Sequence, residues 1–454
     1  MKGFRLSVFK TTAFIFLGFL LTSTGHLAWM YRLMELTSAD VSYQLSTVAG
    51  YALQAVGIGI FALLLKLKRK SSRLIFIIST LGYTACLFPA ILSGSFAFSA
   101  VFGLLLSLLC GVIAGYYLFE LTESGGEHRA ALFGFGYGAA TIGSWLLSVI
   151  GGGSLYYGNG VLVICSVLAA LSVGAALSVG AAFIKAQPSE SEQITADSKP
   201  KIKLSRLLLL CGGVVLLFSL VNNIGFAFSA SAVQGGLRVE FSRLFYAIGL
   251  IGAGFVTDKR RKYGAVCALA ALVIPFIVLA LRGELISTAV FWAIGYFAFG
   301  FYSVYRVILF SDIARDRGII YLSGFGLLIG RVGDSLGSEV NALMSGSELV
   351  LVVCAAVLFI GSVFLFIRLF QIMYVPTAQR KNEREIFDDF SLSYNLSARE
   401  RDVLRLLLDD KTNKEISEEI CVSENTIKFH VRNLLKKTGC KSRVELKTVY
   451  RSAH

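Results

Sequence analysis

Residues 396–450 read LSARERDVLRLLLDDKTNKEISEEICVSENTIKFHVRNLLKKTGCKSRVELKTVY, and they are the only long segment of the chain with the pattern of a water-soluble helical domain. Apolar residues recur in this segment at intervals of three and four, which is the stripe that lets several helices share one core. These residues are Val403, Leu404, Leu407, Ile416, Ile420, Ile427, Val431, Leu434 and Leu435. The sequence before this segment has a different character, so the chain divides into two kinds of structure.

The portion before residue 376 is predicted to lie in a membrane. The chain is 55% hydrophobic and 16% charged, with a mean hydropathy of +0.70, which is too apolar for a soluble protein of 454 residues. Repeated apolar runs of about 20 residues match the hydrocarbon thickness of a bilayer. The first run also resembles a signal peptide, but no clean cleavage site follows it, so we interpret it as a retained span. We predict about twelve spans, at roughly 12–31, 44–65, 74–93, 97–119, 131–150, 161–184, 205–229, 241–257, 263–281, 286–311, 319–343 and 349–370.

The charges of the connecting loops predict the orientation of these spans. One alternate set of loops is basic, with Lys and Arg gathered at 66–73, 185–203 and 259–262. To the other set we assign only Arg32, Arg238, Arg243 and Arg282. By the positive-inside rule the basic loops face the cytoplasm. With an even number of spans both termini are then cytoplasmic, and we expect a multi-pass protein of the bacterial inner membrane.

Composition divides the chain into five predicted segments. Residues 185–204 are polar and contain two prolines, which predicts a flexible linker between two halves of six spans. Residues 371–391 are highly charged with mixed signs, which predicts a short tether that is either a solvated spacer or a helical lever. The predicted segments are 1–184 (first half), 185–204 (cytoplasmic linker), 205–370 (second half), 371–391 (charged tether) and 392–454 (soluble domain).

The stretch GFVTDKRRK, residues 254–262, follows the eighth predicted span. It is similar to the cytoplasmic motif G-x-x-x-D-(R/K)-x-G-(R/K) of the major facilitator superfamily, although it lacks the second glycine. An internal repeat points the same way, because Arg129 and Arg317 are each followed at the same distances by two glycines. The resemblance implies an all-α membrane bundle of two six-span halves joined by a cytoplasmic linker.

Burying an ionisable residue inside a span costs several kcal/mol or forces pairing, and four residues are the clear cases. They are Arg306, Arg331, Asp334 and Glu339. Arg331 and Asp334 are three residues apart, so they share a helix face. Two interpretations remain open: a charge cluster that locks the bundle, or a ligand site in which Arg306 and Arg331 meet an acidic group of a small molecule. His26, Gln54, Asn222 and Asn223 are further cavity candidates, although each is interpreted first as a helix-packing residue.

Net charge alone is weak evidence for nucleic-acid binding, because residues 1–376 carry +11 of the total of +14. The local charge is more informative. Between Cys421 and His454, eight Lys and Arg residues face only two glutamates. Eight singly scattered cysteines show no metal-ligand or redox spacing, and no nucleophile or phosphate-binding constellation is evident. We therefore predict no metal, no cofactor and no enzymatic activity.

Capping signals predict four helices in the soluble domain. Ser397 and Glu400 form a capping box for a first helix through about Leu408. Thr412 or Asn413 starts a second helix, which ends near Ile420. Ser423 caps a third helix, Gly439 ends it, and residues 441–450 form a fourth. Two short helices joined by a tight turn, the second of them basic, are typical of a helix-turn-helix that lays its second helix in the major groove.

Helical geometry sorts the residues of that second helix. Ile427, Val431 and Leu434 form the buried stripe, so the opposite face is predicted to meet DNA. The predicted base-reading residues are Asn425, Lys428, Phe429 and Arg432. The predicted phosphate contacts are Thr412, Asn413, Ser423, Thr426, Lys436 and Lys437.

These residues carry a second resemblance. The runs LSARERDVL (396–404), NKEI (413–416) and VSENTIKFH (422–430), with Lys437, stand as in the LuxR-type, or GerE-type, helix-turn-helix domain. The resemblance implies a four-helix DNA-binding module that commonly dimerises through its last helix, here Ser442 to Tyr450. It also implies that Lys428, Phe429 and Arg432 occupy the base-reading positions.

The two resemblances together favour a membrane-bound one-component regulator. A membrane domain would sense a small molecule or the state of the membrane and control DNA binding by the C-terminal domain. The expected partners are double-stranded DNA, membrane lipid, a small-molecule ligand and a second copy of the chain on DNA. The alternative is a small-molecule carrier whose tail regulates its own genes.

Overall fold

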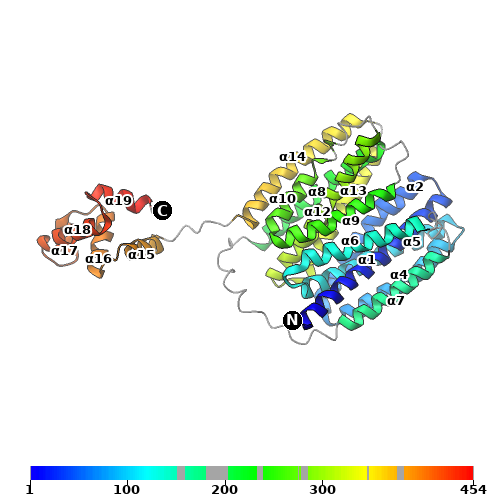
Figure 1. Ribbon diagram of the computed structural model, residues 1–454, viewed down its shortest axis with the longest axis horizontal. Coiled ribbons are helices and arrows are strands. Elements are labelled where there is room, and N and C mark those ends of the chain that lie inside the picture. The colour runs from blue at the N-terminus through cyan, green and yellow to red at the C-terminus, as the bar shows by residue number, and fades with distance from the viewer. Residues whose placement is uncertain are drawn as a thin grey trace. The chain divides into compact units, whose positions relative to one another are not determined.

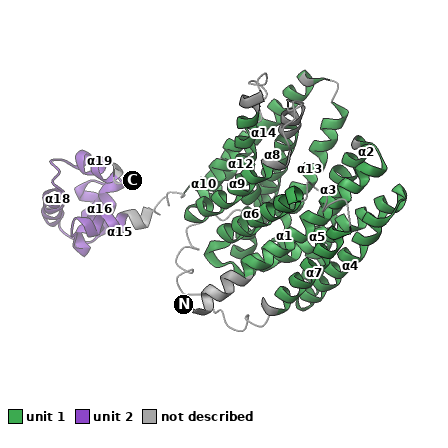
Figure 2. Cartoon of the chain, turned by 45° about the vertical axis from the view of Figure 1, so that its right-hand side comes forward, with its two compact units in different colours: residues 1–193, 200–375 green, residues 194–199, 376–454 purple. Residues whose placement is uncertain are grey.

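The computed structural model describes residues 2–150, 159–179, 203–232, 239–274, 276–277, 285–344, 347–375 and 383–452. Its described residues are helices and connecting turns, without a strand. They form two compact units, one within residues 2–375 and one within residues 383–452 (Figure 2). The predicted linker lies outside the described residues except for residues 203 and 204, and residues 376–382 of the predicted tether also lie outside them.

The first unit is a bundle with a helix at each of the twelve predicted spans. Figure 1 shows α4 and α7 at one edge of this bundle and α14 at the opposite edge. The helices are α1 (Lys2–Leu36), α2 (Ala39–Tyr43), the π-helix η1 (Gln44–Ala49), α3 (Gly50–Leu67), α4 (Ser72–Leu92), α5 (Phe96–Ser124), α6 (Arg129–Val149), α7 (Gly160–Val179), α8 (Leu204–Ala232), α9 (Val239–Lys259), α10 (Arg261–Ala271), α12 (Leu285–Asp316), α13 (Phe325–Leu343) and α14 (Glu348–Met373).

Nine helical stretches among the described residues are long and apolar enough to cross a membrane. They confirm that the chain is a membrane protein, as its hydropathy predicts. The helices at the three remaining predicted spans are α9, α10 and α13. Helix α13 carries the three ionisable residues Arg331, Asp334 and Glu339.

Glycines bring the two predicted halves into close contact at α6 and α9. A Cβ on Gly134 of α6 would lie 2.3 Å from the Leu250 carbonyl oxygen, and a Cβ on Gly254 of α9 would lie 2.6 Å from the Ala130 carbonyl oxygen. Small residues allow such close backbone approach between helices in a membrane, where dispersion contacts replace the hydrophobic effect. This contact positions α9 beside the helices of the first half.

The second unit contains the four expected helices and one more (Figure 1). These are α15 (Glu383–Ser393), α16 (Ala398–Leu408), α17 (Asn413–Glu419), α18 (Glu424–Thr438) and α19 (Arg443–Ser452). The predicted caps are present, because Ser397 and Glu400 form a capping box and Gly439 ends α18 at φ 71°. Phe387 and Phe390 of α15 lie in the same core as Val403 and Leu434. The second half of the predicted tether is therefore a helix of this domain.

Candidate functional site

Helices α17 and α18 form the predicted helix-turn-helix. Thr412 and Glu415 cap α17 reciprocally, with the Thr412 amide 2.7 Å from the Glu415 carboxylate. Between the helices Cys421 adopts a left-handed φ of 54°, and the Val422 amide donates to the Ser417 carbonyl at 3.0 Å. Ser423 then caps α18 by accepting from the Thr426 amide at 3.2 Å. These bonds fix the direction in which α18 leaves the turn.

Helix α18 has one buried face and one exposed face, as predicted. Ile427, Val431 and Leu434 lie in the domain core. The predicted base-reading residues Asn425, Lys428, Phe429 and Arg432 are all exposed. The Phe429 side chain is unusually open for an aromatic residue at 51%, and the Arg432 guanidinium lies 5.9 Å from its ring centroid. Lys428 forms an ion pair of 2.9 Å with Glu424 one turn earlier. The pair is exposed, so DNA can take the place of Glu424 as the partner of Lys428.

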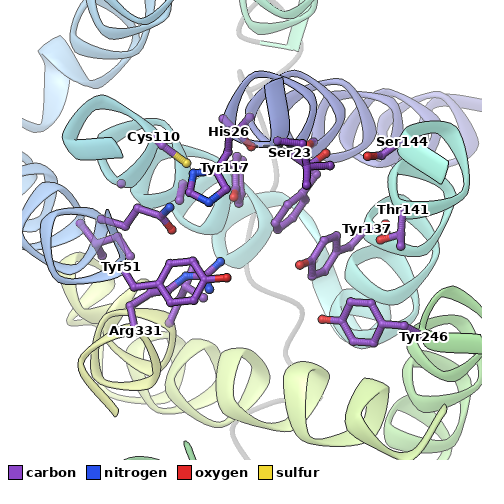
Figure 3. A pocket seen from close by; sticks show the side chains of 18 of the residues that line it. Ser23, His26, Tyr51, Cys110, Tyr117, Tyr137, Thr141, Ser144, Tyr246 and Arg331 are labelled. Atoms are coloured by element: carbon purple, nitrogen blue, oxygen red, sulfur yellow. Dashed lines mark hydrogen bonds between the residues drawn. The ribbon is translucent and has the colours of Figure 1, made fainter. Parts of the chain in front are cut away.

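The membrane unit contains a cavity of about 270 Å³ lined by helices of both predicted halves (Figure 3). Helices α1, α3, α5 and α6 contribute one side of its lining, and α9, α12 and α13 contribute the other. His26 and Gln54, which the sequence suggested as cavity residues, both line it. The polar and aromatic lining side chains include Thr22, Ser23, His26, Tyr51, Gln54, Tyr117, Tyr137, Thr141, Ser144, Arg243, Tyr246, Tyr296 and Arg331.

The four ionisable residues predicted inside the spans have different surroundings. Asp334 accepts from Arg306 at 3.1 Å and from Arg331 at 3.5 Å, so the predicted pairing within α13 is present. Arg331 lines the cavity and stacks on Tyr51 at 4.3 Å, whereas Arg306 is not among the lining residues. Glu339 takes part in none of the ion pairs among the described residues.

The structure corrects the predicted place of Arg243. We assigned it to a loop, although position 243 falls inside the predicted span 241–257. It lies instead within α9, where it lines the cavity. The close packing of α9 against α6 brings that part of α9 to the cavity. The predicted span thus places Arg243 in a helix, and only the packing of that helix shows that the residue reaches the cavity.

Comparison with known proteins defines the second unit. Residues 394–450 match the family described as bacterial regulatory proteins, luxR family. These residues form a luxR-type helix-turn-helix domain. The chain is 48% identical over 48 residues to the spore germination protein GerE of Bacillus subtilis, which covers 11% of this chain and 65% of that protein. It is 44% identical over 70 residues to the nitrate/nitrite response regulator protein NarP of Escherichia coli, which covers 14% of this chain and 31% of that protein.

The chain thus spans less than two thirds of each of these relatives, and the matched stretches are short parts of this chain. The match identifies residues 394–450 as a DNA-binding regulatory domain, and its relatives imply a bacterial origin. The membrane unit has a different likeness. It shares its fold with the fucose:proton symporter FucP of E. coli, with a TM-score of 0.54 and 16% identity over 80% of this chain and 99% of that chain. The expected major-facilitator-like architecture is confirmed.

Two of the predicted phosphate contacts are engaged inside the luxR-type domain. Asn413 accepts a hydrogen bond from the guanidinium of Arg443 in α19. Lys437 donates to the Glu400 carboxylate at 2.6 Å and to the Asn395 carbonyl at 2.9 Å. Thr412, Ser423 and Lys436 are exposed and Thr426 is half-buried, with its hydroxyl 2.8 Å from that of Ser423. The internal bonds of Asn413 and Lys437 join elements far apart in sequence, which a local pattern does not reveal.

Glu400 connects two helices of the luxR-type domain, although the sequence predicted it only as part of a capping box. Its side chain is 5% exposed, and it accepts from the Ser397 amide at 2.8 Å as well as from Lys437. Burial alone would raise the pKa of this carboxyl, but the hydrogen bonds from Lys437 and Ser397 outweigh it and hold the pKa of Glu400 below its usual range. The pair ties α18 to the start of α16.

A charge network joins the predicted halves of the membrane unit at the ends of α6, α9, α10 and α12. Asp312 accepts from Arg129 at 2.6 Å and from Arg261 at 2.8 Å. Asp258, the aspartate of the 254–262 stretch, accepts from the Ala131 amide at 2.7 Å at the start of α6. The stretch thus contacts the opposite half even without its second glycine.

Proposed function

We propose that this chain is a membrane-bound one-component transcription regulator. Its membrane unit binds a small molecule or responds to the state of the membrane, and its conformation controls sequence-specific DNA binding by the luxR-type domain. The observation that carries the proposal is the exposed face of Lys428, Phe429 and Arg432 on a capped helix of a DNA-binding domain. That domain is joined in one chain to a membrane unit with a polar cavity.

DNA is recognised by α18 in the major groove. Lys428 and Arg432 are one turn apart, so both can donate to guanine O6 and N7, while Asn425 suits adenine and Phe429 suits a thymine methyl group. Thr412, Ser423, Thr426 and Lys436 contact phosphate and set the position of the domain. Asn413 and Lys437 contribute less to phosphate binding because their polar groups already bind Arg443 and Glu400.

The DNA-bound form is a homodimer on a two-fold site. A single helix-turn-helix contacts too few bases for strong specificity, and dimers place two recognition helices one turn of DNA apart. Helix α19 supports this proposal, because Val444 is 76% exposed on it. An apolar side chain so open to solvent fits the self-complementary contact of a two-fold dimer.

The bacterial inner membrane is the proposed location, with both termini cytoplasmic and lipid around the bundle. The Lys and Arg residues at 66–73 and 259–262 support this orientation through the positive-inside rule. The orientation puts the luxR-type domain in the compartment that contains DNA. Helix α15 is the proposed connection between the two units, because its phenylalanines belong to the core of the luxR-type domain and residues 376–382 link it to α14.

A small-molecule carrier with a regulatory tail is the second candidate. The cavity between the halves favours it, because carriers bind their substrates between such halves. Uptake into proteoliposomes that collapses with Arg331→Ala would support this candidate.

The proposed DNA recognition is tested by selecting bound sequences from a random duplex pool with residues 383–454, a unit with its own core. We expect the natural domain to enrich one consensus and the Lys428→Ala/Arg432→Ala variant to lose it. Arg399→Ala is the matched control, because Arg399 is an exposed arginine of α16 that pairs with Asp402. Enrichment of the same consensus by the double variant would refute the proposed recognition.

A further inference from the structure

The cavity of the membrane unit is lined by cationic groups with unused hydrogen-bond donors. Nε of Arg331 and Nη1 of Arg243 are buried and have no hydrogen-bond partner among the described residues. Both residues line the cavity, and they come from α13 and α9. A buried donor left unpaired costs roughly 1–3 kcal/mol, and more when the group is charged. The cavity lining therefore lacks a hydrogen-bond acceptor for these two donors.

The nearby carboxylate does not balance these arginines. Asp334 is shared by Arg306 and Arg331, and it lies closer to Arg306, at 3.1 Å against 3.5 Å. Arg243 takes part in no ion pair among the described residues. Among the described residues, Asp334 thus pairs with two guanidinium groups, those of Arg306 and Arg331, and Arg243 adds a third positive charge beside the cavity. In a low-dielectric interior such an excess favours an anion strongly.

The rest of the lining indicates the body of the ligand. Five tyrosines line the cavity: Tyr51, Tyr117, Tyr137, Tyr246 and Tyr296. Figure 3 shows the rings of Tyr137 and Tyr246 on one side and the ring of Tyr51 beside Arg331. Phe19 stacks on Tyr137, with ring centroids 3.9 Å apart. Aromatic walls of this kind accept a planar ring by stacking or edge contacts.

The volume restricts the ligand to a small one. The cavity measures about 270 Å³, just below the range of roughly 300–1,000 Å³ that is typical of pockets for drug-sized ligands. A molecule with one ring and a short acidic side chain suits this space. Arginine in turn prefers carboxylate, because its planar fork can donate two parallel hydrogen bonds.

We propose that the ligand is a small aromatic acid whose carboxylate binds between Arg331 and Arg243 and whose ring lies among the tyrosines. Arg306 positions Asp334 and does not touch the ligand. This inference rests on the proposed function only in taking the cavity as the ligand site of the membrane unit. It excludes amines and favours acids over their neutral amides.

The test uses the purified full-length protein in detergent and three probes: benzoate, 3-phenylpropionate and 4-hydroxyphenylacetate. Each acid is compared with its amide and with the matching amine by calorimetry and thermal shift. We expect at least one acid to bind and to raise the melting temperature, and its amide and amine to bind at least ten-fold more weakly. Equal binding of amide or amine, or binding by none of the acids, would overturn the proposal.

Variants locate the binding. Arg331→Gln and Arg243→Gln are expected to weaken acid binding at least ten-fold, while Arg331→Lys retains part of it because the charge remains. The matched control is Arg368→Gln, because Arg368 is an exposed arginine of α14 stacked on Phe364. Undiminished binding by a folded Arg331→Gln protein would refute the site. The selection of DNA by residues 383–454 does not involve the cavity, so failure of the acid probes and failure of DNA recognition are separate results.

Discussion

Arg129 of α6 and Asp312 of α12 form an ion pair of 2.6 Å between the two predicted halves of the membrane unit, and the Arg129 side chain is only 7% exposed. Arg261 adds a second guanidinium to the same carboxylate at 2.8 Å. Three helices thus depend on one acidic group. The carboxylate of Asp312 is therefore a shared partner of guanidinium groups from both halves at this end of the bundle.

Asp312→Asn is expected to lower the melting temperature of the full-length protein in detergent. Removing one partner of a buried pair leaves a charge without compensation and costs about 3–5 kcal/mol. Arg69→Gln is the control, because Arg69 is 60% exposed in its pair with Glu123 and exposed pairs contribute about 0–1 kcal/mol. Equal shifts in the two variants would show that the Asp312 network does not hold the halves together.

Glu400 is expected to make the stability of the luxR-type domain depend on pH. Its folded pKa lies below the ordinary value of 4.5, so its contribution is complete above that value and is lost as the pH falls through the folded pKa. Denaturant unfolding of residues 383–454 between pH 6 and about pH 3 measures this loss. Glu400→Gln should be less stable at pH 6 and lose less stability on acidification. A parallel pH profile for the natural domain and this variant would contradict the assignment.

Base-reading and phosphate-contacting residues are expected to differ in their salt dependence. Lys428→Ala and Arg432→Ala should each weaken binding to the selected site by about 1–3 kcal/mol and relax preference at one position. Lys436→Ala should weaken binding to all sequences and reduce the slope of log affinity against log salt by about 1. Fluorescence anisotropy at several salt concentrations separates the two patterns. A pure slope change in Lys428→Ala would reassign Lys428 to phosphate.

Helix α15 is expected to stabilise the luxR-type domain although it precedes residues 394–450. Phe390 is 4% exposed, and its ring lies 5.1 Å from that of Tyr450 in α19. Phe390→Ala should therefore cost about 3–5 kcal/mol in unfolding free energy. Leu392→Ala, on the same helix but 64% exposed, should change stability little. If Phe390→Ala unfolds like the natural domain, α15 is not part of its core.

The local features of the luxR-type domain were predictable because each is set by neighbours in sequence. The capping box of Ser397 and Glu400 depends on residues three apart, and Gly439 ends α18 in a left-handed conformation that glycine adopts without strain. The shared exposure of Lys428 and Arg432 follows from the helical period alone. The order of these signals along the sequence also carries the resemblance to the luxR-type domain.

The missed features depend on contacts between distant elements. Phe387 and Phe390 stand in a highly charged stretch, and only their packing on Arg405 and Tyr450 shows that α15 belongs to the domain. Arg243 reaches the cavity because α9 packs on α6. Arg306 and Arg331 were candidates for either a charge cluster or a ligand site, and their different surroundings likewise follow from the arrangement of α12 and α13 around Asp334.

Chromatin immunoprecipitation of the full-length protein in its own cells, followed by sequencing, tests the central claim most directly. The account predicts discrete sites that share the consensus selected by residues 383–454. These sites are retained by Arg399→Ala and lost by Lys428→Ala/Arg432→Ala, with all three proteins present in the membrane fraction at equal levels. Unchanged occupancy in the double variant, or no discrete sites for the natural protein under any growth condition that produces it, would contradict the claim that this membrane protein regulates transcription through α18.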